Sequence, residues 1–396
     1  IYMTELDNFF NLSNDYFSLS CKKCTFRIEE TLKTNGQPHK ILTVYPVNNE
    51  IINYAFSGSQ GLCLTTPHGS LQNKNVLGSL ISLPATNVKK VLGFFEEHGY
   101  LLPISPEGTE IDIAALVEVL NRIKATVLLM TALEKPSLDY KQILHLTLYL
   151  LLGTQVTLNG TARITYSTYR HPFHDGIRNQ AAIDSLQQSS ETESITVKDM
   201  IYAPSYELNP DEYDDISNGE TFTYDYPGIN DTLYRQVTIA YKNNNIQSRN
   251  LRLMIEFLFH YMHSVGVIKA VTFEGGIEYY GSPDFSKFDS QLKKVAVLIA
   301  RLVLSGEINH NTRSIKPFYN PNSLEPSWKA PSLLSALYFS IFYMKPGSEI
   351  YRKCANPSCH KYFLVKTSNS RKKYCCDNCR NANNQRSHRI KVQKSK

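Results

Sequence analysis

The chain has 396 residues, of which 42% are hydrophobic and 20% are charged. This composition can bury a large core, and it excludes a chain that is disordered over most of its length. The charge is unevenly distributed: residues 351–396 contain 13 Lys and Arg against one acidic residue, whereas residues 1–350 contain 29 basic and 35 acidic residues. An acidic body followed by a basic C-terminal segment indicates a polyanionic partner for that segment.

Cysteine usage and hydropathy indicate the compartment. Five of the eight cysteines lie between residues 354 and 379, which is unlike the spread of a disulfide framework through a secreted domain. The longest apolar runs, 144–152 and 295–304, are shorter than the ~20 residues that span a bilayer. We therefore expect a soluble, cytoplasmic protein with no membrane partner.

The first part of the chain predicts a β-hairpin followed by three helices. Segments 41–47 and 51–56 are rich in β-branched and aromatic residues and are separated by Asn48-Asn49, which favours a turn. Apolar residues then recur at three- and four-residue spacing, which is typical of amphipathic helices. These helices are expected over 86–98, 111–133 and 138–152.

The remaining body predicts a mixture of strands and helices. Polar residues dominate 176–225, which suggests surface loop and helix and an internal boundary. Strands are expected over 162–169, 237–241 and 267–273, and helices over 251–263, 290–304 and 332–343. The Pro- and Asn-rich segment 317–331 is expected to be a linker or a pinned loop. The predicted fold class is α+β, with a mixed, helix-rich body over 1–345 and a small C-terminal treble-clef zinc module over 350–396.

The zinc module is predicted from cysteine spacing. Cys354 and Cys359 form a Cys-x4-Cys pair, and fifteen residues later Cys375 and Cys379 form a Cys-x3-Cys pair. Four thiolates at such spacing suit tetrahedral Zn²⁺, and a site closed by four protein ligands is structural, not catalytic. The segment has few apolar residues, so zinc binding would supply much of its folding free energy.

Five cysteines compete for four positions in this site. Cys375 fits the Cys-x3-Cys register, whereas Cys376 fits a Cys-x2-Cys register. Cys375 is favoured because it directly follows a predicted return strand at 372–374, which would pair with a strand at 362–365 across a turn at 368–370. A helix is expected from Asp377 to residue 392.

This pattern resembles the CGNR-type zinc fingers of bacterial proteins. The matching features are the cysteine pairs, an aromatic residue after the first pair, a basic turn, an aromatic residue before Cys375 and an Arg-rich helix, carried by Cys354, Cys359, Phe363, Ser370, Arg371, Tyr374, Cys375, Cys379, Arg386 and Arg389. The motif letters differ, because the chain reads Cys379-Arg380-Asn381-Ala382. The resemblance implies a DNA-binding finger of a transcription regulator.

The C-terminal helix carries the predicted nucleic-acid surface. Lys and Arg neutralise phosphates, and Arg, Asn and Gln can also contact base edges. The residues expected to contact nucleic acid, DNA in preference to RNA, are Arg371, Lys372, Lys373, Arg380, Arg386, Arg389 and Lys391. The body is expected to sense a ligand or to bind a partner.

Two other classes of function stay open, although we expect no enzymatic activity. The basic helix could instead dock on a protein, including the acidic body, as an adaptor would. An enzyme site could lie in the body, where His171, His174 and Asp175 cluster. A second metal site would need Cys21 and Cys24 to be joined by Cys63 and His68.

Overall fold

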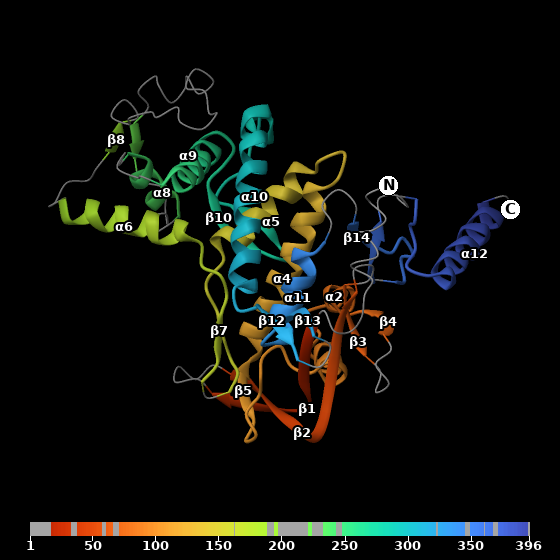
Figure 1. Ribbon diagram of the computed structural model, residues 1–396. Coiled ribbons are helices and arrows are strands. Elements are labelled where there is room, and N and C mark those ends of the chain that lie inside the picture. The colour runs from red at the N-terminus through yellow and green to blue at the C-terminus, as the bar shows by residue number, and fades with distance from the viewer. Residues whose placement is uncertain are drawn as a thin grey trace. The chain divides into compact units, whose positions relative to one another are not determined.

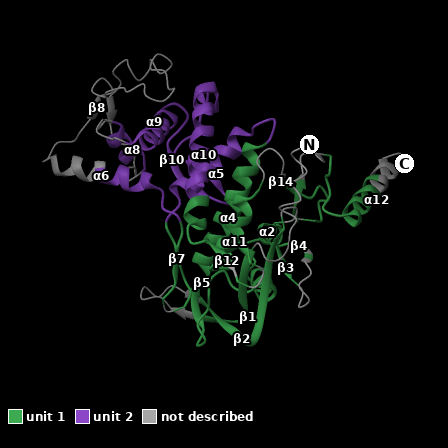
Figure 2. Cartoon of the chain, in the orientation of Figure 1, with its two compact units in different colours: residues 1–134, 155–168, 308–396 green, residues 135–154, 169–307 purple. Residues whose placement is uncertain are grey.

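The structure is a computed structural model (Figure 1). It describes residues 17–32, 38–57, 61–65, 71–161, 163–187, 194–196, 221–223, 233–242, 248–321, 324–344, 349–359, 361–366 and 371–394. The chain divides into two compact units (Figure 2). The first unit contains residues 1–134, 155–168 and 308–396, and the second contains residues 135–154 and 169–307.

A seven-stranded sheet organises the first unit. Its strand order is β12-β13-β1-β2-β3-β4, and β5 pairs with β2 beside this row. Only β1 and β13 pair in parallel; the other described pairs in this sheet are antiparallel. The strands are β1 (Phe17–Leu32), β2 (Pro38–Ser57), β3 (Gly61–Thr65), β4 (Leu71–Asn75), β5 (Thr109–Asp112), β12 (Lys316–Asn320) and β13 (Glu325–Lys329).

The predicted hairpin at 41–56 is wrong, because both of its segments belong to β2. Asn49 has φ +61°, a conformation that Asn tolerates better than most residues. The register between β1 and β2 shifts between Lys22 and Cys24, so the ladder is interrupted by an irregularity and then continues. The long partner strand β1 therefore converts an expected turn into a bulge.

The predicted linker at 317–331 is also wrong. Its residues form the antiparallel pair β12–β13, in which Pro317 lies opposite Trp328. Strand β13 then joins the sheet through β1, with Phe17 opposite Trp328. Prolines are tolerated in this pair because edge positions do not need every backbone N–H.

Four α-helices of the first unit are α2 (Val76–Ile81), α3 (Val88–His98), α4 (Ile113–Leu133) and α11 (Leu333–Phe342). The helices predicted over 86–98, 111–133 and 332–343 are confirmed as α3, α4 and α11. Each begins where a side chain caps it, at Asn87, Asp112 and Ser332. Phe339 of α11 is buried against Phe17 and Phe56, with ring centroids 5.0 and 5.2 Å apart.

The first unit also contains the short pair β6 (Thr157–Asn159) and β7 (Thr165–Ser167), which confirms a strand within 162–169.

The second unit is mainly helical. Its elements are α5 (Tyr140–Leu152), α6 (Pro172–Gln187), β8 (Ser194–Thr196), β9 (Thr221–Thr223), α8 (Leu233–Lys242), α9 (Arg249–Ser264), β10 (Ile268–Thr272), β11 (Gly276–Tyr279), η4 (Phe285–Lys287) and most of α10 (Ser290–Thr312). The expected helices over 138–152, 251–263 and 290–304 and the strand over 267–273 are confirmed. Most of the predicted polar segment 176–225 lies outside the described residues.

The predicted strand at 237–241 is wrong, because these residues form the end of α8. Tyr234, Val237 and Tyr241 are buried at helical spacing. Tyr241 stacks on Phe259 of α9 with ring centroids 4.0 Å apart and an interplanar angle of 6°. Packing against α9 therefore outweighs the strand preference of the β-branched run.

Both unit architectures combine helices with strands, so the α+β class is confirmed. Across the described residues, none of the helices has the length and apolar character that crossing a membrane requires.

Candidate metal centre

The C-terminal module is built from a hairpin and a helix. Strand β14 (Glu349–Lys353) pairs antiparallel with β15 (Tyr362–Lys366), and α12 (Asp377–Lys394) follows. The predicted strand at 362–365 and the predicted helix are confirmed. The predicted return strand at 372–374 is wrong: β14 is the partner of β15, and the backbone of Lys373 instead accepts one hydrogen bond from the N–H of Ala355.

Four cysteines from separate parts of this module come together. Cys354 directly follows β14, Cys359 ends the turn before β15, Cys375 precedes α12, and Cys379 lies in the first turn of α12. Their sulfur atoms all lie within 4.8 Å of one another. The Sγ of Cys375 lies 3.7 Å from that of Cys359 and 3.6 Å from that of Cys379.

These distances fit a tetrahedral metal ion. Zn–S bonds of about 2.3 Å in a regular tetrahedron place the sulfur atoms ~3.8 Å apart. Four thiolates are also the donor set that soft or borderline metals prefer. The four cysteines are therefore arranged to hold one metal ion.

Cys376 lies beside this group. Its sulfur is 3.9 Å from that of Cys375, but its side chain is exposed and it is not one of the four close together. Of the two alternatives at this position, the structure places Cys375 in the group.

Hydrogen bonds from the backbone act on the sulfur atoms. Burial disfavours ionisation of Cys354, but the N–H groups of Cys375 and Asn356 donate to its sulfur, and its pKa is lowered overall. Burial, and the hydrogen bonds that the Cys375 thiol donates to the neighbouring sulfur atoms, raise the pKa of Cys375. The Cys375 thiol therefore stays protonated and shares its proton in hydrogen bonds with the neighbouring sulfur atoms. A bound cation would displace that proton.

Asn356 connects both cysteine pairs. It is 9% exposed, and its side chain donates to the sulfur of Cys379. Its Oδ1 accepts the N–H of Ser358 at 3.2 Å, and its carbonyl accepts the N–H of Cys359 at 2.9 Å. From the sequence, Asn356 was not identified as a hydrogen-bond donor to a sulfur.

The hairpin of this module is anchored to α2. The Tyr351 hydroxyl donates to Oδ1 of Asn75 at 2.9 Å, and the N–H of Tyr362 donates to the hydroxyl of Ser82 at 2.7 Å. Between these bonds lies Gly78, where an added Cβ would be 3.3 Å from a ring carbon of Tyr351. Tyr351 and Val365 are 3% and 1% exposed. The hairpin is thus part of the packed first unit.

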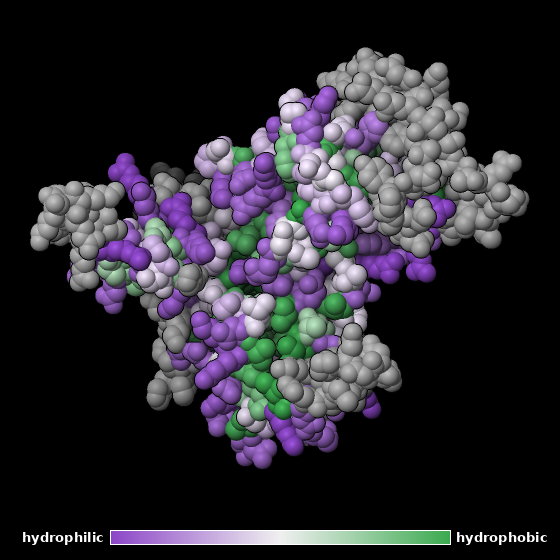
Figure 3. All heavy atoms as spheres, turned by 180° about the vertical axis from the view of Figure 1, so that it is seen from behind, coloured by the Kyte–Doolittle hydropathy of each residue, from purple (hydrophilic) through white to green (hydrophobic). Residues whose placement is uncertain are grey.

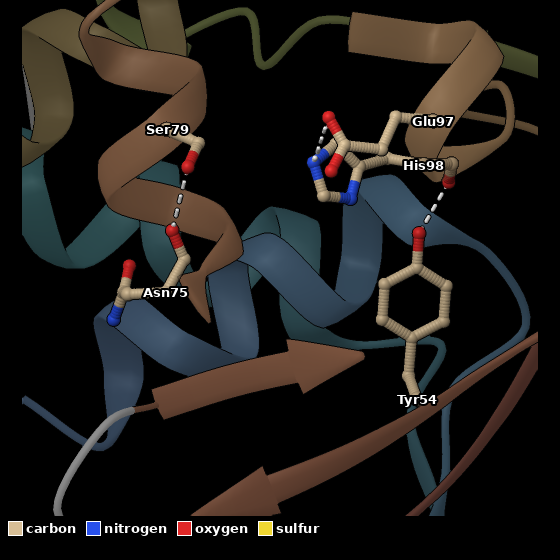
Figure 4. A network of polar contacts seen from close by, with 5 residues as sticks. All are labelled: Tyr54, Asn75, Ser79, Glu97 and His98. Atoms are coloured by element: carbon tan, nitrogen blue, oxygen red, sulfur yellow. Dashed lines mark hydrogen bonds and ion pairs between the residues drawn. The ribbon is translucent and has the colours of Figure 1, made fainter. Parts of the chain in front are cut away.

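Asn75 is the central residue of this anchor. Figure 4 shows its position at the start of α2, where its carbonyl accepts the Ser79 hydroxyl at 3.1 Å. Its Oδ1 accepts the N–H of Gly78 and caps the helix. No sequence signal marked Asn75 as a partner of the module, because the contact spans 276 residues.

The predicted nucleic-acid residues are exposed wherever their side chains are described. Arg371, Lys372 and Lys373 precede the cysteine pair, and Arg380 and Arg386 lie on α12. The side chains of Arg389 and Lys391 lie outside the described part. In Figure 3 the side chains around the described part of α12, at the left, are mainly hydrophilic.

The basic residues nearest the cysteines have internal partners. Arg380 pairs with Asp377 at 3.2 Å, although both side chains are more than half exposed. The Lys372 ammonium lies 5.6 Å from the ring centroid of Phe363. Such exposed pairs contribute little to stability and can be exchanged for a ligand.

The weaker candidates of the body form no group of close metal-binding side chains within the described residues. Among the described residues, the C-terminal four are the one group of close metal-binding side chains, and His68 lies outside the described residues. Arg170 pairs with Asp175 at 2.8 Å, His174 bonds to the carbonyl of Leu151, and His171 accepts the N–H of Phe173. These contacts give each group a structural partner.

Comparisons of this chain with models of protein families, with curated proteins and with solved structures find no match.

Proposed function

We propose that this protein binds DNA through α12, and that one structural zinc ion holds the N-terminal end of this helix in its fold. The observation that carries the proposal is an exposed basic helix that begins inside a group of four sulfur atoms arranged for a metal. Zinc is the metal of choice because tetrahedral sulfur sites of this kind are typical structural zinc sites. With four protein ligands there is no position for a water, which supports a structural role and no catalysis by the metal.

The charge of the helix and its approach supports a polyanionic ligand. From Arg371 to Lys394 the chain has eight Lys and Arg, and Asp377 is the single acidic residue. Apolar side chains are rare in α12, so the helix does not have the apolar face that packing on a protein core requires. Its described residues 377–387 are exposed or half-buried, which favours an external ligand over docking on the acidic body.

Asparagine and glutamine side chains on α12 support contacts to the bases of DNA. Asn381, Asn384 and Gln385 lie on the exposed helix among the arginines. A helix of this kind fits the major groove of B-DNA, whereas the major groove of A-form RNA is too narrow for it. Together with the resemblance to CGNR-type fingers, this supports a transcription regulator whose remaining residues sense a ligand or partner.

The nucleic-acid proposal is tested with the full chain and a random-sequence DNA duplex across a salt series. We expect affinity to fall steeply with salt, and Arg380→Gln with Arg386→Gln to reduce the slope by about 1 for each lost phosphate contact. Lys89→Gln with Lys90→Gln, on the exposed side of α3, is the matched control. Equal loss in both double variants, or binding that salt does not change, would refute the proposal.

The zinc proposal is tested by metal content. Cys375→Ser should reduce bound zinc well below one ion per chain, whereas Cys376→Ser should leave it unchanged, because only Cys375 belongs to the sulfur group. Both variants change one thiol to one hydroxyl, one residue apart. Equal metal content in the two variants would contradict the assigned ligand set.

A further inference from the structure

A groove with a volume of about 460 Å³ lies within the second unit (Figure 2). It is formed by the start of α5 and the residues before it, by η4 and by the first turn of α10. Its lining includes three aromatic residues, Tyr140, Phe285 and Phe288, and two lysines, Lys141 and Lys293. Small-molecule sites in proteins typically occupy about 300–1,000 Å³, so the groove has room for one such molecule.

The two ammonium groups of the groove lie near aromatic rings. The Lys141 ammonium is 4.1 Å from the ring centroid of Phe285. The Lys293 ammonium is 5.6 Å from the ring centroid of Phe288 and 5.9 Å from that of Tyr140. Within the described part of the chain, neither ammonium group pairs with a carboxylate. Cation–π contacts at exposed positions are weak, so an anion can draw both ammonium groups away from the rings.

The carboxylate in the groove lining, that of Asp139, is already used. Its Oδ1 accepts the N–H of Gln142 at 3.1 Å and caps α5. The charge of this carboxylate is offset by the positive end of the helix dipole, whereas the charges of Lys141 and Lys293 are not offset by an acidic partner. The groove therefore favours an anionic ligand.

The exposed ring of the groove is held by a series of aromatic contacts. Phe285 is 37% exposed, and its ring lies edge-on to that of Tyr279, with centroids 6.1 Å apart. The hydroxyl groups of Tyr279 and Tyr261 are hydrogen-bonded at 2.6 Å, and the ring of Tyr261 lies edge-on to that of Phe288. The stacking surface is therefore preformed, which lowers the ordering cost of binding a flat ring.

We propose that this groove binds one nucleotide, with its base stacked on Phe285 and its phosphate held by Lys141 and Lys293. Basic side chains beside exposed aromatic rings are the combination with which proteins hold unpaired nucleotides, because every base has a π-face and every phosphate is negatively charged. On binding, the Lys141 ammonium moves from the ring to the phosphate, and the base takes the ring face that it leaves.

The proposal rests on the proposed function only in treating the nucleotide as the ligand that the body senses. Binding is measured without duplex DNA, so either proposal can fail while the other stands. The same chemistry describes a free mononucleotide and one nucleotide of a single strand, and the experiments below distinguish the two.

The first test measures binding of adenosine 5′-monophosphate, adenosine and ribose 5-phosphate to the full chain by titration calorimetry. The nucleotide should bind saturably, and the other two at least about 5-fold more weakly, because adenosine lacks the phosphate and ribose 5-phosphate lacks the base. No saturable binding of the nucleotide up to about 5 mM, or equal affinity for all three compounds, would overturn the proposal.

Substitution of the ring tests the stacking contact. Phe285→Leu keeps an apolar side chain but removes the π-face, so it should weaken binding of adenosine 5′-monophosphate roughly 5-fold. Phe342→Leu is the matched control, because Phe342 is also exposed but lies on α11 in the first unit, and it should leave binding unchanged. Equal affinity of the two variants would refute the role of Phe285.

Two adjacent lysines on α10 test the phosphate contact. Lys293→Gln should weaken adenosine 5′-monophosphate about 3-fold and leave adenosine unchanged, because one ion pair with the phosphate is lost. Lys294 is exposed and lies outside the groove lining, so Lys294→Gln should change neither affinity. The same loss in both variants would show a general charge effect and no phosphate site in the groove.

A single-stranded oligodeoxyadenylate of about ten nucleotides identifies the source of the nucleotide. If the groove holds part of a strand, Phe285→Leu should weaken both the oligonucleotide and adenosine 5′-monophosphate; if it holds a free mononucleotide, the variant should weaken the latter alone. Loss of neither would refute the proposal. Arg380→Gln with Arg386→Gln should leave adenosine 5′-monophosphate binding unchanged, because both arginines lie on α12.

Discussion

The hydroxyl of Tyr351 and the side-chain oxygen of Asn75 are 2.9 Å apart and form a hydrogen bond. The same oxygen accepts the N–H of Gly78, so one atom both caps α2 and anchors the hairpin beside the metal centre. Cys354 lies three residues after Tyr351, at the end of β14. The position of the first sulfur ligand is thereby tied to the start of a helix in the body.

Loss of this bond should destabilise the first unit measurably. Tyr351→Phe removes a buried hydroxyl and should cost about 0.5–1.5 kcal/mol of the free energy of unfolding. Asn75→Ala removes the cap as well and should cost about 1–2 kcal/mol. In urea denaturation of the full chain, the double variant should lose less than the sum of the two, because both substitutions remove one shared bond. Additive losses would show that the bond contributes nothing.

Substitutions at two helical glycines distinguish the effect of helix propensity on stability from the effect of close packing. Gly93 is exposed on α3 and an added Cβ would meet nothing within 4 Å, so Gly93→Ala should stabilise the chain by about 0.5–1 kcal/mol. At Gly78 the Cβ would lie 3.1 Å from Oδ1 of Asn75 and 3.3 Å from the Tyr351 ring. Gly78→Ala should therefore destabilise, by about 1 kcal/mol, in spite of the same gain in propensity. Stabilisation by both substitutions would contradict tight docking of the hairpin.

Helices were predictable because their signals are local. Asn87, Asp112 and Ser332 cap helices whose apolar spacing is visible within the same ten or twenty residues. The strands of the seven-stranded sheet were not, because their partners are distant: β13 is defined by pairing with Phe17, and the bulge at Asn49 by pairing with β1. Helix α8 was mistaken for a strand because its burial against Phe259 is a tertiary contact.

In the metal centre, too, features set by local sequence were predictable and features set by distant contacts were not. The grouping of the four cysteines followed from their spacing, since two short turns bring each pair together. The strand pairing did not, because the turn from Cys354 to Cys359 lies inside the hairpin and makes β14 the partner of β15. Asn75 was not identifiable at all, since nothing near it in the sequence points to Tyr351.

Asn356 should control the affinity for the metal without being a ligand. Its side-chain amide donates to the sulfur of Cys379, and such bonds stabilise thiolate charge and orient the ligand. Asn356→Ala should weaken zinc binding about 10- to 100-fold in competition with a chromophoric chelator. Asn356→Asp keeps the acceptor for the N–H of Ser358 but replaces the donor with a negative charge, so it should weaken binding further. Asn381→Ala, exposed on α12, is the control and should bind zinc normally.

The buried His260 should make the second unit sensitive to acid. Its side chain is 0% exposed and lies edge-on to the stacked rings of Tyr241 and Phe259. Burial, with a smaller effect of His263, lowers its pKa to about 3. An unfolded histidine has a pKa of about 6.5, so below that pH protons bind the unfolded chain first. The stability from neutral His260 is complete above pH ~6.5 and is lost as the pH falls toward 3, by about 1.4 kcal/mol per pH unit. Between pH 7 and pH 5 the free energy of unfolding should therefore fall by about 2 kcal/mol more in the unaltered chain than in His260→Gln. Parallel pH dependence of the two proteins would show that His260 does not titrate on unfolding.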